Sequence, residues 1–181
     1  MKTAVEDAEK AIAILPEYGT AWCVMGLAQW QLGETDQALT SFDRFFRLGG
    51  LRHAQAPMAV AAILQSRGDY RGAIELLEKA AVANPDAAIV RNNLAWYLLT
   101  AEPVELRDAA AASAYARSAV ELAPGQGDII DTYISALAAL GRHAEAAHEL
   151  ERLLPTVADA DPYRAALSER LAELRRPSPG N

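Results

Sequence analysis

The feature that most constrains the fold of this chain is a residue spacing that recurs along it. Three glycines each stand five residues before an alanine: Gly33, Gly68 and Gly141. Apolar or small residues follow each alanine at intervals of four and then three, as in the first copy, Ala38, Phe42 and Phe45. The same alanine spacing without the glycine starts at Ala4 and at Ala112. Residues three and four apart share one face of a helix, so the pattern predicts a series of similar helices.

Residues 22–42 show what one unit of the series contains. Trp22, Met25 and Gly26 fall at helical spacing, and Ala38 and Phe42 do so after the glycine at 33. Glycine adopts a left-handed backbone at little cost, which suits it to the turn after a helix. The stretch therefore reads as helix, turn, helix, with one apolar seam that such a pair cannot bury by itself. Copies recur every 34 or 35 residues, with one interval of 39. A period near 34 is typical of stacked helix pairs.

These residues resemble the motif of the tetratricopeptide repeat (TPR) family. The motif residues are Trp22, Met25-Gly26, Gly33, Ala38 and Phe42, and then Val60-Ala61, Gly68, Ala73, Leu77, Ala80 and Pro85; Leu94-Ala95, Ala112, Ala116, Ala119 and Pro124; and Tyr133-Ile134, Gly141, Ala146 and Leu150. The resemblance covers roughly residues 1–155. It implies an all-α fold, a right-handed superhelix of antiparallel helix pairs with about ten helices and a C-terminal capping helix. Phe45, Pro57 and Arg91 depart from the motif.

The repeats divide the sequence as a single solenoid over residues 1–176. A half repeat at 1–18 precedes repeats at about 19–53, 54–87, 88–126 and 127–158, followed by a capping helix at about 161–176. Residues 1–15 read as the second helix of a repeat whose first helix is missing, so we expect a fragment of a longer protein. The third full repeat carries an insertion at 101–107, and residues 177–181 are predicted to be disordered.

Composition excludes several classes of function. The formal net charge is −7, whereas general nucleic-acid binding needs a basic face. No run of 18 apolar residues exists, so no membrane insertion is expected, and the N-terminal stretch carries charges where a secretory signal would be apolar. Cys23 is the only cysteine. A cytoplasmic location is favoured, and a periplasmic one is compatible with a fragment of an exported protein.

No motif predicts catalysis, a cofactor or a metal site. The stretch HAEAAHE places His143 and His148 five residues apart. Zinc-protease histidines are four apart on one face, whereas these are separated by about 140° around a helix. A solvated outer face is the better interpretation. No phosphate loop, nucleophile elbow or dinucleotide fingerprint is present, so we predict a chain that is not an enzyme.

The resemblance implies a binding groove lined by the first helix of each repeat. The matching positions are Cys23, Leu27, Trp30, Met58, Gln65, Asn92, Asn93, Trp96, Asp128 and Asp131. We predict a peptide-binding groove that is apolar and amide-rich in its middle and acidic at one end. The predicted partner is a protein or peptide with apolar anchors and a basic flank. An alternative is that the two tryptophans only fill gaps between repeats. Because these groove positions include no Lys or Arg, a carboxylate clamp of the chaperone-binding type is not expected.

The sequence thus favours a non-catalytic protein-interaction scaffold. The insertion after NNLAWYLLT resembles bacterial TPR proteins, which favours a larger bacterial assembly or secretion protein. Two alternatives stay open: a regulatory or substrate-recruiting domain of an enzyme whose catalytic part is absent, and a self-assembly module. An uncovered apolar seam at the first helix leaves a homodimer through the chain ends open as well.

Overall fold

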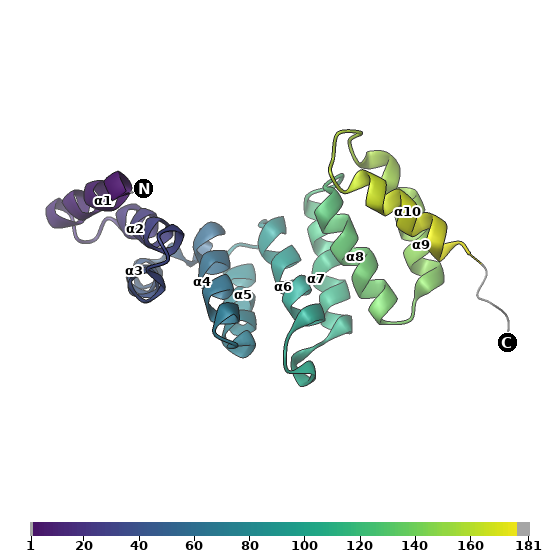
Figure 1. Cartoon of the computed structure of the whole chain (residues 1–181), viewed down its shortest axis with the longest axis horizontal. Helices are drawn as coiled ribbons and strands as arrows, with labels where there is room; N and C mark the ends of the chain where they lie inside the picture. Colours follow the sequence, from purple (N-terminus) through teal and green to yellow (C-terminus); the bar gives the residue numbers. More distant parts are fainter. Residues whose placement is uncertain (1, 177–181) are drawn as a thin grey trace. The chain divides into compact units, whose positions relative to one another are not determined.

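The computed structural model describes residues 2–176, and every regular element in that range is helical (Figure 1). The α-helices are α1 Lys2–Ile14, α2 Gly19–Gln31, α3 Thr35–Arg47, α4 Gln55–Ser66, α5 Tyr70–Ala83, α6 Ala88–Thr100, α7 Ala109–Leu122, α8 Gly127–Ala139, α9 His143–Leu153 and α10 Arg164–Leu174. Short 3-10 turns lie at Gly50–Arg52, Val104–Leu106 and Leu154–Thr156. The predicted all-α architecture is confirmed. None of the helices described combines the length and the apolar character that a bilayer crossing requires.

The chain divides into two compact units. The first, Met1–Pro85, contains α1 to α5, and the second, Asp86–Asn181, contains α6 to α10. Within the first unit α2 packs against α1, α3 and α4, and α4 packs against α5. Within the second, α7 packs against α6 and α8, and α9 packs against α8 and α10. The boundary falls beside the predicted start of the repeat at 88–126, and one continuous solenoid over 1–176 stays a prediction.

Residues 1–15, predicted as the second helix of a repeat, form α1 over Lys2–Ile14. The capping helix, predicted at about 161–176, begins at Arg164 rather than at 161. The reason is that Asp161 makes two contacts that hold the chain in a turn. Its carboxylate accepts a hydrogen bond from the Tyr163 amide at 2.8 Å and another from the Gly127 amide, at the start of α8, at 3.2 Å. The predicted disordered tail, 177–181, lies outside the described residues.

The three turn glycines adopt the left-handed backbone conformation that the turn between two helices requires. Gly33, Gly68 and Gly141 have φ angles of 81°, 78° and 71°. No atom lies within 4 Å of a Cβ built on any of them, so space is available for a side chain. The conformation is therefore the whole reason for glycine, because an L-residue in the left-handed region costs about 1–2 kcal/mol.

Each unit buries its seam with small residues facing large ones. In the first unit a cluster of buried residues joins α2, α3 and α4: Cys23, Ala38, Phe42, Phe45, Ala56, Ala59, Val60 and Ile63. Phe45 departs from the motif, and Gly50 makes room for it, because a Cβ on Gly50 would lie 2.5 Å from the ring. In the second unit Ala112, Ala116 and Ala119 of α7 have no exposed surface.

The alanine seam of α7 gives a direct test of the repeat register. Ala116→Leu is expected to lower the free energy of unfolding by about 1–3 kcal/mol, because the added methylenes overpack a filled interface. Ala114, two residues earlier in α7, is exposed, so Ala114→Leu is expected to change it by less than about 0.5 kcal/mol. Urea unfolding of both variants measures the difference. Equal losses of unfolding free energy in the two variants would contradict the repeat register.

Candidate peptide-binding surfaces

In the first unit, α2 and α4 carry the predicted surface. Trp30 keeps 36% of its surface exposed, while Leu27, Met58 and Gln65 are half-buried. Leu27 packs against the core cluster of this unit and contributes only part of its side chain to the surface. Because α2 and α4 are in contact, these residues lie on neighbouring helices of one compact unit. Trp30 is the large exposed aromatic side chain of this predicted surface.

Cys23 does not belong to that surface. Its side chain is 5% exposed and lies in the core cluster with Phe42 and Ala59. Burial raises the pKa of the Cys23 thiol, so the thiol stays protonated at neutral pH. The prediction of Cys23 as a groove residue is therefore wrong, because the face of α2 that it occupies packs against α3 and α4.

In the second unit, α6 presents one large exposed ring. Trp96 is 41% exposed and meets Tyr97 edge to face, with ring centroids 5.2 Å apart. Asn93 is half-buried, and its Nδ2 donates to the Ile89 carbonyl within the helix at 2.8 Å. Asn92 is only 8% exposed, and its buried Oδ1 has no partner among the described residues. Trp96 and Asn93 thus carry the surface, and Asn92 faces the packing of the unit.

At the acidic end of the predicted groove, one of the two aspartates already forms an ion pair with an arginine of the same chain. Asp131 of α8 pairs with Arg170 of α10, with Oδ1 and Nη1 at 2.7 Å, and the same nitrogen donates to Ser135 Oγ at 3.0 Å. Asp128 is half-buried and forms no ion pair with a described residue. The Asp131 carboxylate is therefore paired within the chain, and of these two aspartates only Asp128 is left to favour a basic ligand.

Arg170 is a residue that the sequence interpretation missed. It lies three residues after Leu167 and one before Leu171, both buried on the packing face of α10. An arginine among the apolar positions of a terminal helix signals an acceptor on the helix beneath it. That signal could have paired Arg170 with one of the aspartates of α8.

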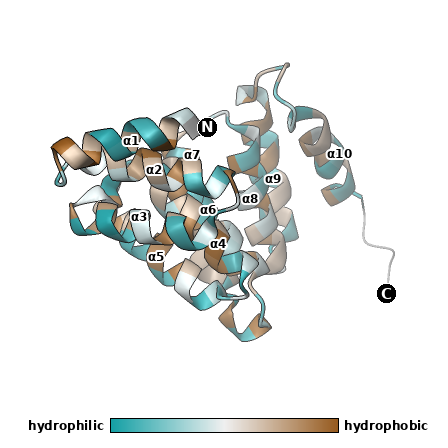
Figure 2. Cartoon of the chain, turned by 60° about the vertical axis from the view of Figure 1, so that its left-hand side comes forward, coloured by the Kyte–Doolittle hydropathy of each residue, from teal (hydrophilic) through white to brown (hydrophobic). Residues whose placement is uncertain are grey.

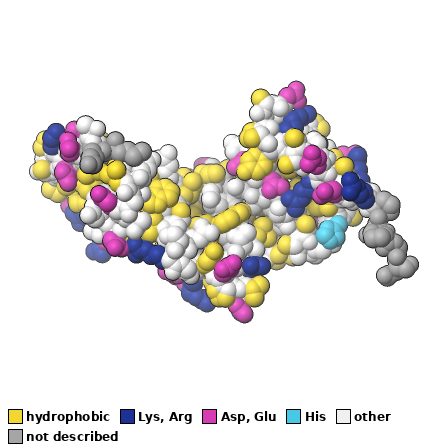
Figure 3. All heavy atoms as spheres, in the orientation of Figure 1, with side chains coloured by type: hydrophobic (Ala, Val, Ile, Leu, Met, Phe, Trp, Pro, Cys, Tyr) yellow, Lys and Arg dark blue, Asp and Glu magenta, His cyan; other side chains and the backbone are white. Residues whose placement is uncertain are grey.

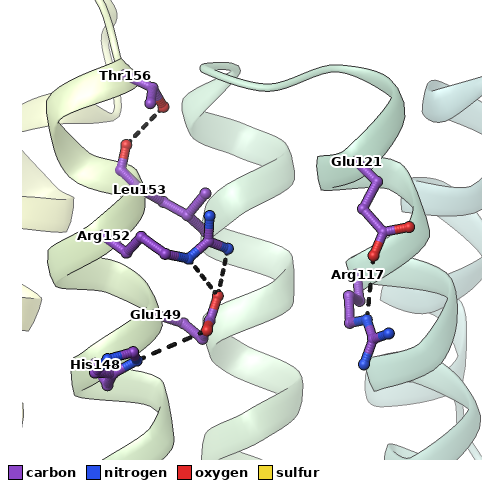
Figure 4. A network of polar contacts seen from close by, with 7 residues as sticks. All are labelled: Arg117, Glu121, His148, Glu149, Arg152, Leu153 and Thr156. Carbon is purple, nitrogen blue, oxygen red and sulfur yellow. Dashed lines mark hydrogen bonds and ion pairs between the residues drawn. The ribbon is translucent and has the colours of Figure 1, made fainter.

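A second groove, which the sequence did not predict, lies between α7 and α9. It has a volume of about 470 Å³, and the residues that line it include Tyr133 of α8 together with Arg117, Glu121, Arg142 and Glu145. Figure 4 shows the Arg117–Glu121 pair on one helix and the Glu149–Arg152 pair on another, with a third helix between them. Burial, and then Glu149 and Glu145, raise the pKa of Tyr133. The arginine and glutamate side chains pair within their own helices, which is typical of a solvated face.

The histidine-rich stretch forms no metal cluster in the described part of the chain. Both His143 and His148 are exposed on α9. His148 Nδ1 lies 3.8 Å from Glu149 Oε1, and no group of three or more His, Cys, Asp or Glu within residues 2–176 is placed to hold a metal ion (Figure 4).

Comparison with known proteins agrees with the repeat and with the fold. A family model described as a tetratricopeptide repeat matches residues 19–48, which comprise α2, its turn and α3. Residues 19–48 are therefore similar to a tetratricopeptide repeat. No curated protein matches the chain significantly in sequence. Repeat proteins of this type are generally non-catalytic scaffolds for protein–protein interaction.

Solved TPR structures cover most of the chain. YrrB, described as a TPR protein with an unusual peptide-binding site, superposes with a TM-score of 0.72 at 22% identity, covering 94% of this chain and 82% of its own. MamA gives 0.64 at 16% identity, covering 93% and 87%. A thermophilic TPR protein of Thermus thermophilus gives 0.60 at 19% identity, covering 93% and 89%. At these identities the likeness shows the fold.

Proposed function

We propose that this TPR protein is a non-catalytic module that binds a peptide or a partner segment on the exposed faces of its first helices. In the first unit these faces belong to α2 and α4, and in the second to α6 and α8. The proposed partner has apolar anchors and a basic flank. The module belongs to a larger bacterial assembly or secretion protein, and the Thermus thermophilus structure among the fold relatives is compatible with a bacterial source.

One observation carries the proposal. Trp30 and Trp96 are large aromatic side chains on first helices, and they keep 36% and 41% of their surface exposed. Burying aromatic surface contributes about 25 cal/mol per Å² removed from water, so a partner gains from covering them. Tryptophan is also enriched among the residues that dominate binding energy at interfaces. The alternative in which both rings only fill gaps is disfavoured by this exposure.

The basic flank rests on Asp128. Its carboxylate has no ion pair within the described residues, whereas Asp131 is neutralised by Arg170 at 2.7 Å. A lysine or arginine of the partner beside Asp128 would gain the attraction that Asp131 already has. A recruiting domain attached to an enzyme would use the same surface. The sequence that flanks this chain in the parent gene distinguishes that alternative from a scaffold, because it would contain a catalytic domain.

A peptide selected against the whole chain tests the proposed surface. For a peptide obtained from a random phage-displayed library, Trp96→Ala or Trp30→Ala is expected to weaken binding by about 2 kcal/mol, roughly thirtyfold in Kd. Isothermal titration of each variant gives the change. Leu122→Ala is the control, because Leu122 is 40% exposed but lies at the end of α7, a second helix of its repeat. Unchanged affinity in both tryptophan variants would contradict the proposal.

A further inference from the structure

The groove between α7 and α9 adjoins a smaller cavity of about 230 Å³. The two share four lining residues, which are Arg117, Glu121, Tyr133 and Glu145. The rest of the smaller cavity is lined by Val120, Glu149 and Arg152. Both lie within the second unit, where α8 packs against α7 and α9, and α8 and α9 run side by side in both views (Figure 1 and Figure 2). They form a hollow on the second helices that is separate from the proposed first-helix surfaces.

Tyr133 brings an unpaired hydroxyl to the place where the groove and the cavity meet. Its side chain is 4% exposed, yet it lines both of them. The hydroxyl makes no hydrogen bond with any residue in the described range 2–176. A buried tyrosine hydroxyl usually has a partner, so an unpaired one beside a cavity marks a position for a polar atom of a ligand.

Glu149 provides a second unpaired acceptor in the smaller cavity. Arg152 donates to only one of its carboxylate oxygens, Oε2, from Nη2 at 2.6 Å and from Nε at 3.3 Å. The other oxygen, Oε1, lies 3.8 Å from His148 Nδ1, which is too far for a hydrogen bond. The Glu149 side chain is 20% exposed, and Figure 4 shows it extending from its own helix toward the middle helix.

Individual atoms decide which charge suits the cavity, because side chains of both signs lie next to one another over the C-terminal helices (Figure 3). The arginines of the cavity reach outward, since the Arg117 and Arg152 side chains are 70% and 58% exposed. Burial raises the pKa of Tyr133 most, and Glu149 and Glu145 raise it further. Arg117 lowers the same pKa by less. The carboxylates therefore outweigh the guanidinium groups at the hydroxyl, which favours a cation over an anion.

We propose that the smaller cavity holds the ammonium group of a lysine from a partner protein, and that the residues next to this lysine lie in the larger groove. An ammonium has three donors and no acceptor, which matches the Tyr133 hydroxyl oxygen and Glu149 Oε1. Val120, in the same lining, gives the apolar stem of the lysine a surface to contact.

The larger groove indicates a protein segment rather than a free amine. Its volume of about 470 Å³ is typical of sites that hold drug-sized ligands, so it has room for more than an ammonium group. Ala110 and Ala114 line it, and side chains this small let the backbone of a partner come close to α7. This site does not depend on the proposed first-helix surfaces.

Two capped peptides test the site. One is acetyl-Ala-Ala-Lys-Ala-Ala-amide, and the other has norleucine in place of lysine. Each is titrated into the isotope-labelled intact chain, and the amide chemical shifts are followed by NMR. The lysine peptide is expected to shift amides of α7 and α9 in a saturable way. The norleucine peptide keeps the stem but lacks the charge, so it is expected to bind at least about tenfold more weakly.

Variants of the two acceptors locate the ammonium. Tyr133→Phe removes the hydroxyl and keeps the buried ring, and Glu149→Gln removes the charge at nearly constant shape. Each is expected to weaken binding of the lysine peptide at least about fivefold. Glu151→Gln is the matched control, because Glu151 lies on the same helix but outside the cavity, paired with Arg175 at 2.5 Å. It is expected to leave binding unchanged.

Four results would overturn the inference. They are equal binding of the two peptides, unchanged affinity in Tyr133→Phe or Glu149→Gln, an equal loss of affinity in Glu151→Gln, and binding of the free diamine cadaverine as tight as that of the lysine peptide. The last result would make a small amine the occupant. Trp96→Ala is expected to leave binding of the lysine peptide unchanged, so failure here is distinct from failure of the proposed function.

Discussion

Replacing Phe42 with alanine is expected to lower the free energy of unfolding by about 3–5 kcal/mol, the usual cost of removing a buried phenylalanine. Its ring has no exposed surface and lies at the centre of the cluster that joins α2, α3 and α4. It packs directly on Gly26, where a Cβ would lie 2.8 Å from the ring Cδ1. Because α2 is already close to α3, the cavity left by the ring is not readily filled by collapse.

Phe46 provides the comparison for this prediction. It lies one turn later on α3, and its ring centroid is 6.4 Å from that of Phe42, but it is only partly buried. Phe46→Ala is therefore expected to cost clearly less than Phe42→Ala. Urea unfolding followed by circular dichroism measures both. If the two substitutions cost the same, the cluster is not organised around Phe42.

Leu137→Ala is expected to cost about 2–5 kcal/mol in the second unit. Leu137 lies in α8, has no exposed surface, and belongs to a helix that contacts α6, α7 and α9. Leu140 follows three residues later, at the end of the same helix, and is 37% exposed. Leu140→Ala is expected to cost less than about 1 kcal/mol, because little apolar area returns to water. A reversed order of the two urea midpoints would contradict the packing described here.

The repeat spacing predicted most of the fold because it records packing directly. Ala38, Ala73, Ala112 and Ala146 have no exposed surface, as small residues at helix crossings should. Gly33 and Gly141 end first helices with positive φ, as their places in the sequence indicated. The start of α10 was predicted less well, because Asp161 is held by the Gly127 amide 34 residues away. A contact that distant leaves no local pattern.

The candidate site was less predictable, because exposure depends on which helices cover a residue. Cys23 and Trp30 belong to the same helix and were placed in one stripe, yet Cys23 is 5% and Trp30 36% exposed. Asp131 was placed with Asp128 at the acidic end of the groove, yet it is paired with Arg170, 39 residues later. The family motif indicates which helix lines a groove. It does not indicate which side chains the helix leaves open in a particular chain.

Amide hydrogen exchange with a library-selected peptide tests most directly the claim that the exposed faces of the first helices are the binding surface. The account predicts that bound peptide slows exchange in α2 and α4 or in α6 and α8, and leaves α9 unchanged. Protection confined to α7 and α9, around the groove that Tyr133 helps to line, would contradict this prediction and would assign binding to the second helices of the repeats.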